Sequence, residues 1–439
     1  MLFNFFLFGY HKRAHCTFSV LVCSALLSSH VLAQTASQQP APAPQFATTL
    51  KQALDAAWQL SPSSRAEGNR RIELAAKEKA AGSWISGEPV AGISHRTDRL
   101  NKNEGFREYE AELELPLWNP GVRAAAQADV SAQRMGLEGQ FVLTRLKLAG
   151  ELRALAASIA TAKVERDLNQ RKVQDANALA QDLSRRVKAG ENARVDALQA
   201  QVVVQQAQAA LALADSQLSR LQTQWHGLTG LAAASPLDET LGSPAGSDPA
   251  GNKAAIAAEQ PVLPDHPVMR QAQAQVRAAQ AKASLASADK RDPMSVGLGV
   301  GHERSSFNSA GETKLRIALR IPLGGDNRNA PRRAAALAEL DAAQAEADAI
   351  ARQIPAEVAA AAAELSAART AQAAASERNR LSTEVQTLIT KSWRLGDSDL
   401  PTRLRADNEQ FEASLALARS AVEVQRAIAN LNQAYGLLP

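Results

Sequence analysis

The stretch Glu108–Leu117, EYEAELELPL, alternates glutamates with tyrosine, alanine and leucine. A period of two is typical of a β-strand that has one polar and one apolar face. The stretch Lys314–Ile321, KLRIALRI, repeats this alternation with lysine and arginine in place of glutamate. Met294–Val300 alternates apolar residues with serine and glycine, and Val90–Arg96 is a weaker run of the same kind. The sequence therefore predicts four strands, arranged as two hairpins.

Each predicted hairpin stands alone between long helical stretches, and a lone two-stranded hairpin is marginal in water. A soluble hairpin with one dry face is the alternative interpretation. In a membrane, hydrocarbon offers no hydrogen-bond partners, so the strands must close into a barrel without edges. Three chains would supply twelve strands, which predicts a homotrimeric transmembrane β-barrel. The charged residues expected to line its lumen are Glu108, Glu110, Glu112, Glu114, Lys314, Arg316 and Arg320.

Two segments of the chain correspond at an offset of about 205 residues, which indicates an internal duplication. Ser61-Pro62 matches His266-Pro267 near the start of each segment. Lys188-Ala189-Gly190 matches Arg394-Leu395-Gly396 further on. The expected domains are a first repeat over residues 48–231, a linker over residues 232–264 and a second repeat over residues 265–439.

Long helices are predicted in both repeats, because alanine, glutamine, arginine and glutamate dominate these stretches. A continuous helix over Asn119–Ala189 would span roughly 105 Å. The helix that follows has an apolar seam with 3-4 spacing from Ala197 to Leu228, and the second repeat has the same seam from Ala406 to Ala434. Such seams are typical of coiled coils, and their small residues favour a hollow cylinder of closely packed helices. The predicted fold is therefore mainly α with a small β part: a coiled-coil helical barrel joined to the strand barrel, internally duplicated.

Residues 1–33 are predicted to form an export signal peptide. Lys12 and Arg13 supply positive charge, Phe18–Leu27 is apolar, and Val31-Leu32-Ala33 fits a small-residue cleavage site. The apolar run is shorter than the ~20 residues that span a membrane. Residues 34–47, rich in proline, alanine and glutamine, are expected to be a disordered leader.

The composition argues against several functional classes. A formal net charge of only +4, with no basic tract containing aromatic residues, argues against nucleic acid as a partner. Both cysteines, Cys16 and Cys23, lie in the predicted signal peptide, and the bulky Val22 disfavours lipidation at Cys23. His95 and His302 occupy nearly equivalent strand positions, but no histidines have metal-ligand spacing. No nucleophile or phosphate-binding motif occurs either. We therefore expect no enzymatic activity, no metal site and no cofactor.

The duplicated pattern resembles the TolC-type outer-membrane efflux proteins, the exit ducts of tripartite pumps. The resemblance covers about Leu50 to Gly436 and includes the run RVKAGENARVDALQAQ at Arg186–Gln201. The run ELPLWNPGVR at Glu114–Arg123 is similar to the strand-to-helix joint of the CzcC-like branch, which serves heavy-metal pumps. The resemblance implies a duct in the outer membrane of a Gram-negative bacterium, with a periplasmic helical extension. It also implies a homotrimer that is surrounded by outer-membrane lipid. Its protein partners would be a periplasmic adaptor protein and an inner-membrane pump of the RND type.

The resemblance further implies a closed periplasmic gate and two helix-turn-helix tips that dock onto the adaptor. The second repeat departs from the better-studied members, because Thr402 and Arg405 stand where those members have acidic residues. Asp196 lies where the family often has an aspartate of the gate. It could pair with Arg394, Arg403 or Arg405, and the sequence does not choose among them. The expected tip residues are Val187, Lys188, Ala189, Gly190, Leu395, Gly396 and Asp397. The expected gate residues are Asp196, Trp393, Arg394, Arg403 and Arg405.

The sequence does not identify the transported substrate. Heavy-metal efflux, drug efflux and type I secretion all fit a passive duct of this kind. The rival architecture is a periplasmic coiled-coil adaptor, which would have one helical hairpin, glycine-rich β domains and an inner-membrane anchor. Two duplicated helical hairpins with four amphipathic strands favour the duct.

Overall fold

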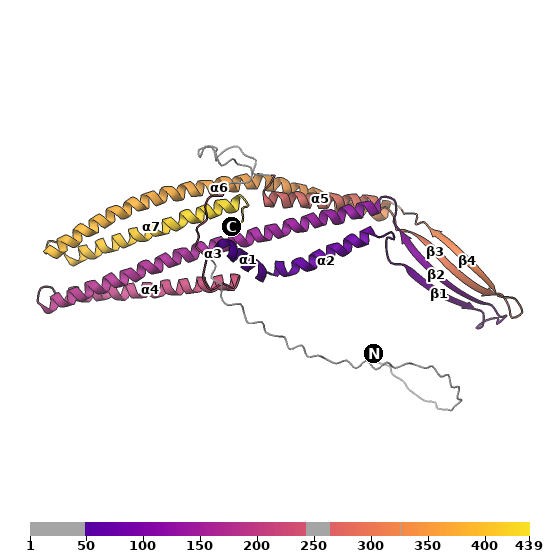
Figure 1. The fold of residues 1–439 in the computed structure, drawn as a ribbon, viewed down its shortest axis with the longest axis horizontal. Coiled ribbons are helices and arrows are strands. Elements are labelled where there is room, and N and C mark those ends of the chain that lie inside the picture. Colours follow the sequence, from indigo (N-terminus) through magenta and orange to yellow (C-terminus); the bar gives the residue numbers. More distant parts are fainter. Residues whose placement is uncertain (1–48, 243–263, 325) are drawn as a thin grey trace, which may run out of the picture. The chain divides into compact units, whose positions relative to one another are not determined.

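The computed structural model describes residues 49–242, 264–324 and 326–439. The predicted signal peptide, the predicted leader and residues 243–263 of the predicted linker lie outside the described residues. The described chain consists of long helices and one small sheet (Figure 1).

The two repeats contain the same series of elements. The first consists of α1 (Leu50–Leu60), α2 (Pro62–Gly82), β1 (Val90–Thr97), β2 (Arg107–Leu117), α3 (Val122–Lys188) and α4 (Arg194–Thr229). The second consists of α5 (Pro267–Ala288), β3 (Met294–Arg304), β4 (Glu312–Arg320), α6 (Asp326–Leu395) and α7 (Leu400–Ala434). The predicted duplication and its order of elements are confirmed, and α1 is an addition in front of the helix that matches α5.

The helices α2 and α5 begin in the same way. Each has a proline at its start, where the missing N–H costs no intrahelical hydrogen bond. Ser61 Oγ accepts a hydrogen bond from the Ser64 N–H at 3.1 Å. His266 Nδ1 accepts one from the Val268 N–H at 3.2 Å. The matching X-Pro steps in the sequence are therefore capped helix starts.

The four strands form one antiparallel sheet in the order β1-β2-β3-β4 (Figure 1). Strands β2 and β3 pair along their whole length, from Arg107 opposite Arg304 to Leu117 opposite Met294. The expectation that each hairpin stands alone is therefore wrong. The hairpins join because β2 and β3 are both 11 residues long and satisfy each other's backbone hydrogen bonds. Within the chain, β1 and β4 are the edge strands.

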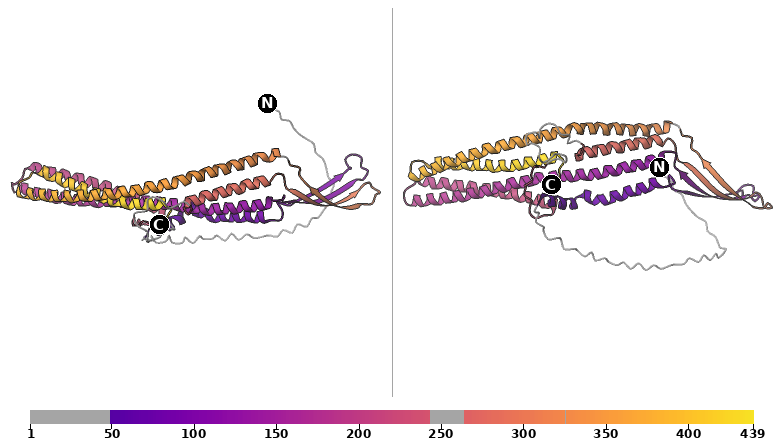
Figure 2. Two further views of the ribbon diagram at one scale, coloured as in Figure 1. Left: turned by 90° about the horizontal axis from the view of Figure 1, so that it is seen from above. Right: turned by 45° about the horizontal axis from the view of Figure 1, so that its top comes forward.

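The helices pack as two antiparallel hairpins, α3 with α4 and α6 with α7, and α5 lies against both α3 and α6 (Figure 2). The predicted seams are confirmed, because residues on them are buried. These residues are Ala200, Val204, Ala207, Leu221 and Trp225 in α4, and Ala406, Ala413, Val424, Ala427 and Leu431 in α7. Of the helices in the described ranges, none is long and apolar enough to cross a membrane.

The largest buried cluster surrounds the middle of α3, where α1, α4 and the segment after α4 converge. Trp225 and Leu152 are completely buried there. Beside them Arg153, which is 3% exposed, pairs with Glu239 at 2.9 Å. Arg153 also donates a hydrogen bond to the Leu437 carbonyl oxygen at 3.0 Å. This buried ion pair fastens both the segment after α4 and the carboxyl-terminal end of the chain to α3.

Candidate functional site

The polar face of the sheet collects the charged residues that were predicted to line a lumen. The glutamates of β2 and the cations of β4 lie on the same side, because residues in register on neighbouring strands share a face. The strand between them, β3, contributes Ser295, Gly297, Gly299 and Gly301 to this side. The structure adds three charged residues that the lumen prediction omitted: Arg96, Glu303 and Glu312.

Ion pairs run across this polar face. They join Arg96 to Glu108 at 3.1 Å, Lys314 to Glu303 at 2.8 Å and to Glu312 at 3.8 Å, Arg320 to Glu114 at 2.7 Å, and Arg316 to Glu110. The pairs of Arg316 and Arg320 reach across β3 from β4 to β2. Among the described residues Glu112 has no ion-pair partner on this face. Six carboxylates and four cations share the face, so it is acidic overall.

The glycines of β3 leave space above the middle of the sheet for these long-range pairs. A Cβ built on Gly297 would lie 2.7 Å from Glu112 Oε1, so the Glu112 carboxylate would have to move aside. A Cβ on Gly299 would lie 3.6 Å from the Arg316 Cβ, in the space above β3. Glycine therefore keeps the face open so that charges on β2 and β4 can meet. The alternating glycines are visible in the sequence, but their role depends on the register of three strands.

The opposite face of the sheet is apolar and exposed. Ile93 is 90% exposed, and Leu315 and Ile317 are each 73% exposed. No helix in the described part of the chain packs over the sheet to any significant extent. A contiguous apolar surface of this kind marks a membrane or protein contact.

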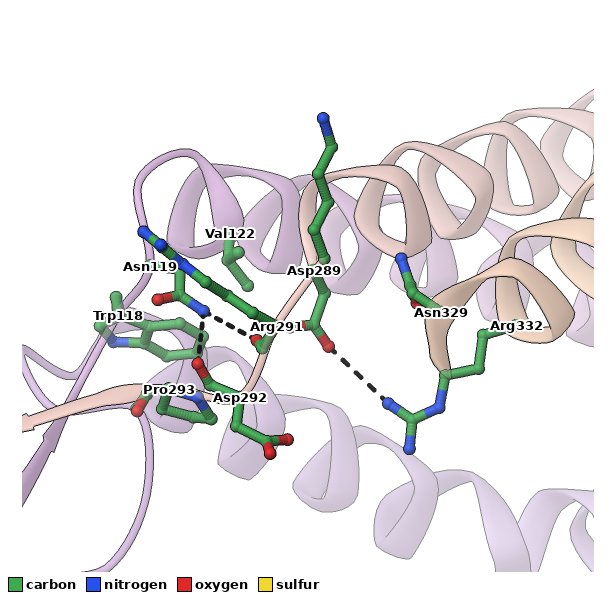
Figure 3. Close-up of a pocket in the computed structure, with 11 residues that line it drawn as sticks. Trp118, Asn119, Val122, Asp289, Arg291, Asp292, Pro293, Asn329 and Arg332 are labelled. Carbon is green, nitrogen blue, oxygen red and sulfur yellow. Dashed lines mark hydrogen bonds and ion pairs between the residues drawn. The ribbon is translucent and has the colours of Figure 1, made fainter. Parts of the chain in front are cut away.

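A joint between the sheet and the helices ties the two repeats together (Figure 3). Asn119, which is 7% exposed, donates hydrogen bonds from Nδ2 to the carbonyl oxygens of Arg291 at 2.9 Å and Asp292 at 3.0 Å. A cavity of about 260 Å³ lies beside these bonds, and Arg332 on its wall pairs with Asp289 at 4.0 Å. The run Glu114–Arg123 is therefore a strand-to-helix joint, as its sequence predicts. Through Asn119 it also connects the first repeat to the segment that precedes β3 in the second repeat.

The predicted tips are two helix ends with the same geometry. Gly190 and Gly396 have φ angles of +81° and +88°. Gly190 N–H bonds to the Val187 carbonyl at 3.1 Å, and Gly396 N–H bonds to the Trp393 carbonyl at 3.1 Å. In both, the next residue's N–H bonds to the carbonyl five positions back, which completes a Schellman motif. Both glycines are exposed with nothing near the position of a Cβ, so the turns are open to a partner.

Trp393, a predicted gate residue, lies in the contact between the two helical hairpins. It is 6% exposed and packs in one cluster with residues of all four helices: Leu179, Leu183, Ala200 and Leu400. The guanidinium groups of Arg186 and Arg403 lie 4.5 Å and 4.1 Å from its ring centre. Burial lowers the pKa of the Arg403 guanidinium, and Asp407, at 3.6 Å, opposes this shift. The indole therefore holds the two hairpins of one chain together.

In the described part of the chain, no arginine forms an ion pair with Asp196. Asp196 instead accepts a hydrogen bond from Asn192 Nδ2 at 3.2 Å. Arg403 pairs with Asp407, and Arg394 and Arg405 are exposed. Asp196 lies in the first turn of α4, and its hydrogen-bond partner is four residues before it in the chain. The gate itself stays a prediction.

The two strand histidines lie in one row on the apolar face, with Tyr109 between them in the register. His95 stacks on Tyr109 with ring centroids 4.4 Å apart. His302 Nδ1 lies 3.1 Å from Thr313 Oγ1. Within the described ranges, no group of three or more histidine, cysteine, aspartate or glutamate side chains could hold a metal ion.

Comparison with known proteins agrees with this architecture. The family model of outer membrane efflux proteins matches residues 260–437, a range that includes α5, β3, β4, α6 and α7. The outer membrane protein VceC from Vibrio cholerae is 17% identical with a TM-score of 0.69, over 88% of this chain and 96% of that chain. CusC is 16% identical with a TM-score of 0.69, over 89% of this chain and 92% of that chain. The open state of the Neisseria gonorrhoeae outer membrane channel MtrE is 18% identical with a TM-score of 0.67, over 89% of each chain.

The chain therefore has the fold of the outer-membrane channels. The match of the family model to residues 260–437, together with this fold, confirms the resemblance to TolC-type outer-membrane efflux proteins. No curated protein matches the chain in sequence. The CzcC-like branch stays a prediction.

Proposed function

We propose that three copies of this chain form a duct in the outer membrane of a Gram-negative bacterium. Substrate would pass through it passively, from an inner-membrane pump and a periplasmic adaptor to the exterior. The observation that carries this proposal is the sheet, which has an exposed apolar face, a charged face and two unpaired edges. In lipid such edges must be paired, because hydrocarbon offers no hydrogen-bond partners.

The number of chains follows from the size of the lumen. One chain supplies four strands and cannot close around a pore. Two chains would supply eight, and the interior of an eight-stranded barrel is filled by side chains. A water-filled lumen lined by the charged face needs the twelve strands of three chains. The fold shared with outer-membrane channels supports this assembly.

The test is the mass of the protein extracted from outer membranes in mild detergent. Native mass spectrometry is expected to give three chains, with strand signal in the circular dichroism spectrum. A monomer or dimer that retains the strand signal would contradict the proposal. Cross-linking in intact membranes provides the control against dissociation in detergent.

The tips are proposed as the docking site for the adaptor. Their turns are open and alike in both repeats, and Leu395 beside Gly396 is 69% exposed. In this proposal Leu395 packs against apolar side chains of the adaptor, which removes its exposed surface from water. In this proposal the predicted tip residues all contact the adaptor, and the two turns give each chain two docking positions.

For the cargo, the charged face favours cations. Carboxylates exceed cations on this face, and a lumen with a surplus of negative charge concentrates cations. This supports the heavy-metal interpretation, and we propose an RND-type pump as the partner. The test is growth of a deletion strain with and without the gene in graded metal salts and in drugs. Restored tolerance to metals alone supports this cargo, whereas restored tolerance to drugs alone, or loss of a secreted protein alone, contradicts it.

A further inference from the structure

Two arginines lie side by side on the apolar face of the sheet, at its loop end. Arg107 of β2 is directly opposite Arg304 of β3. Both have the same strand parity as Tyr109 and His302, so both lie on the apolar face. Like charges directly opposite one another on neighbouring strands destabilise the pair. The two guanidinium groups are therefore a candidate binding site for a negatively charged group from outside the chain.

The other face of the sheet provides the contrast. There, Arg96, Lys314, Arg316 and Arg320 all have carboxylate partners. In the described part of the chain, no ion pair joins Arg107 or Arg304 to a carboxylate. These two guanidinium groups are therefore the cations of the sheet whose charge the chain itself leaves uncompensated.

The position of Arg304 is fixed by a contact between the two loops of the sheet. Its Nε donates a hydrogen bond to the Gly105 carbonyl oxygen at 3.4 Å, and its guanidinium lies 5.9 Å from the Phe307 ring centre. The Phe307 N–H donates to the Glu104 carbonyl oxygen at 3.0 Å. Gly105 has a φ of +97°, and a Cβ there would lie 2.5 Å from the Phe307 nitrogen, so only glycine allows this approach. The chain itself therefore holds Arg304 in place.

The position of the two arginines along the strands indicates their depth in the membrane. The apolar face runs from Leu117 and Met294 up to the row of His95, Tyr109 and His302. From Leu117 to Tyr109 the strand rises about 27 Å at ~3.4 Å per residue. At a tilt of ~40° this corresponds to about 21 Å across the membrane, close to the ~25 Å apolar band of outer-membrane barrels. The next row on that face contains the two arginines, at the level of lipid headgroups.

We propose that Arg107 and Arg304 bind phosphate groups of outer-leaflet lipid. This proposal rests on the proposed function, because it requires the apolar face to lie in the membrane. The planar guanidinium fork suits bidentate contacts to phosphate oxygens, and one phosphate between the arginines removes their repulsion. The apolar rows directly below contact the acyl chains of the same lipid. That continuity assigns a lipid phosphate, and not free phosphate, to the site.

The experiment measures lipid bound to the purified trimer by native mass spectrometry. The probe is diphosphoryl lipid A in mixed micelles, compared with dephosphorylated lipid A and with inorganic phosphate. The wild type is expected to retain diphosphoryl lipid A. The variant Arg107→Gln with Arg304→Gln is expected to lose at least about tenfold in affinity. The variant Arg107→Lys with Arg304→Lys keeps the charge and is expected to recover part of the binding.

The matched control is Arg96→Gln with Lys314→Gln, which removes two positive charges from the other face of the same sheet. It is expected to bind lipid A like the wild type. Equal binding by the Arg107→Gln, Arg304→Gln trimer would overturn the lipid site. So would displacement of lipid A by an equal concentration of inorganic phosphate. Wild-type trimers that form but retain no lipid A overturn this inference alone, whereas the absence of membrane trimers overturns the proposed function.

Discussion

Neighbouring residues of β4 lie on opposite faces of the sheet, which gives a prediction for Arg316 and Ile317. Ile317 is 73% exposed on the apolar face, and Arg316 pairs with Glu110 on the polar face. A charge on the lipid side near the middle of the membrane costs ~2–4 kcal/mol, whereas a lumen position is hydrated. Ile317→Arg is therefore expected to reduce the yield of trimer in outer-membrane extracts. Arg316→Leu is expected to assemble nearly normally, and full assembly of Ile317→Arg would show that the faces are assigned wrongly.

Trp393 gives a second prediction at this scale, for stability. Its ring is buried between the two hairpins and stacked by two arginines. Trp393→Ala is expected to lower the free energy of unfolding by about 3–5 kcal/mol, because it leaves a cavity between the hairpins. Trp393→Phe keeps an aromatic ring and should cost clearly less. Thermal unfolding followed by circular dichroism compares the two variants, and an unchanged midpoint for Trp393→Ala would contradict the packing role.

At the scale of the element, the start of α5 gives a pH prediction. His266 caps this helix with a neutral Nδ1, and its other ring nitrogen lies 3.1 Å from the Ala434 carbonyl oxygen. Burial lowers the pKa of the imidazole below its ordinary 6.5. As the pH falls, the His266 imidazole is protonated in the unfolded chain before it is protonated in the folded chain. The contribution of His266 to the free energy of unfolding is therefore fully present above about pH 6.5 and is lost as the pH drops below this value. His266→Asn keeps an N-cap acceptor and should show a flatter decline of the thermal midpoint from pH 7.5 to 5.5. A decline as steep as that of the wild type would exclude His266 as its source.

The turns at the tips give a prediction that separates docking from helix ending. Leu395→Asp changes the exposed surface and leaves the turn intact, so trimers should form normally while adaptor capture falls at least about tenfold. Gly396→Val places a β-branched residue at a φ of +88° and is expected to cost about 1 kcal/mol or more in stability. Gly68→Asp adds the same charge on the exposed surface of α2 and is expected to leave capture unchanged. Pull-down with the adaptor together with trimer yield measures both effects, and normal capture by Leu395→Asp would contradict docking at the tips.

At the scale of the whole molecule, the acidic surplus of the charged face is expected to set the ion preference of the proposed duct. Glu112 has no ion-pair partner among the described residues, so its charge acts fully on passing ions. Glu112→Gln removes three negative charges from a trimer and should reduce the permeability ratio of K⁺ to Cl⁻. Reversal potentials in planar bilayers under a KCl gradient measure this ratio. Glu78→Gln on α2 is the control, and an equal ratio in both variants would contradict a lumen position for Glu112.

The sequence by itself determined the types of element and their duplication. Alternation along Glu108–Leu117 predicts a strand, and the 3-4 spacing from Ala197 to Leu228 predicts a packed helix, because both periods are properties of a single segment. The glycines at 190 and 396 likewise predict helix ends, since a positive φ is a local requirement. The structure confirms these local predictions.

The tertiary structure alone decided how segments far apart in the chain meet. It joined β2 to β3 at Arg107 and Arg304, placed Trp393 between two arginines, and directed Asp196 to Asn192 instead of an arginine. Periodicity assigns each residue to a face of its own segment, but it does not contain the register between two segments. That register depends on packing and backbone pairing summed over whole elements, and a shift of one residue would exchange the two faces. The charge pairs across the glycine row and the uncompensated arginines therefore exist only in the folded chain.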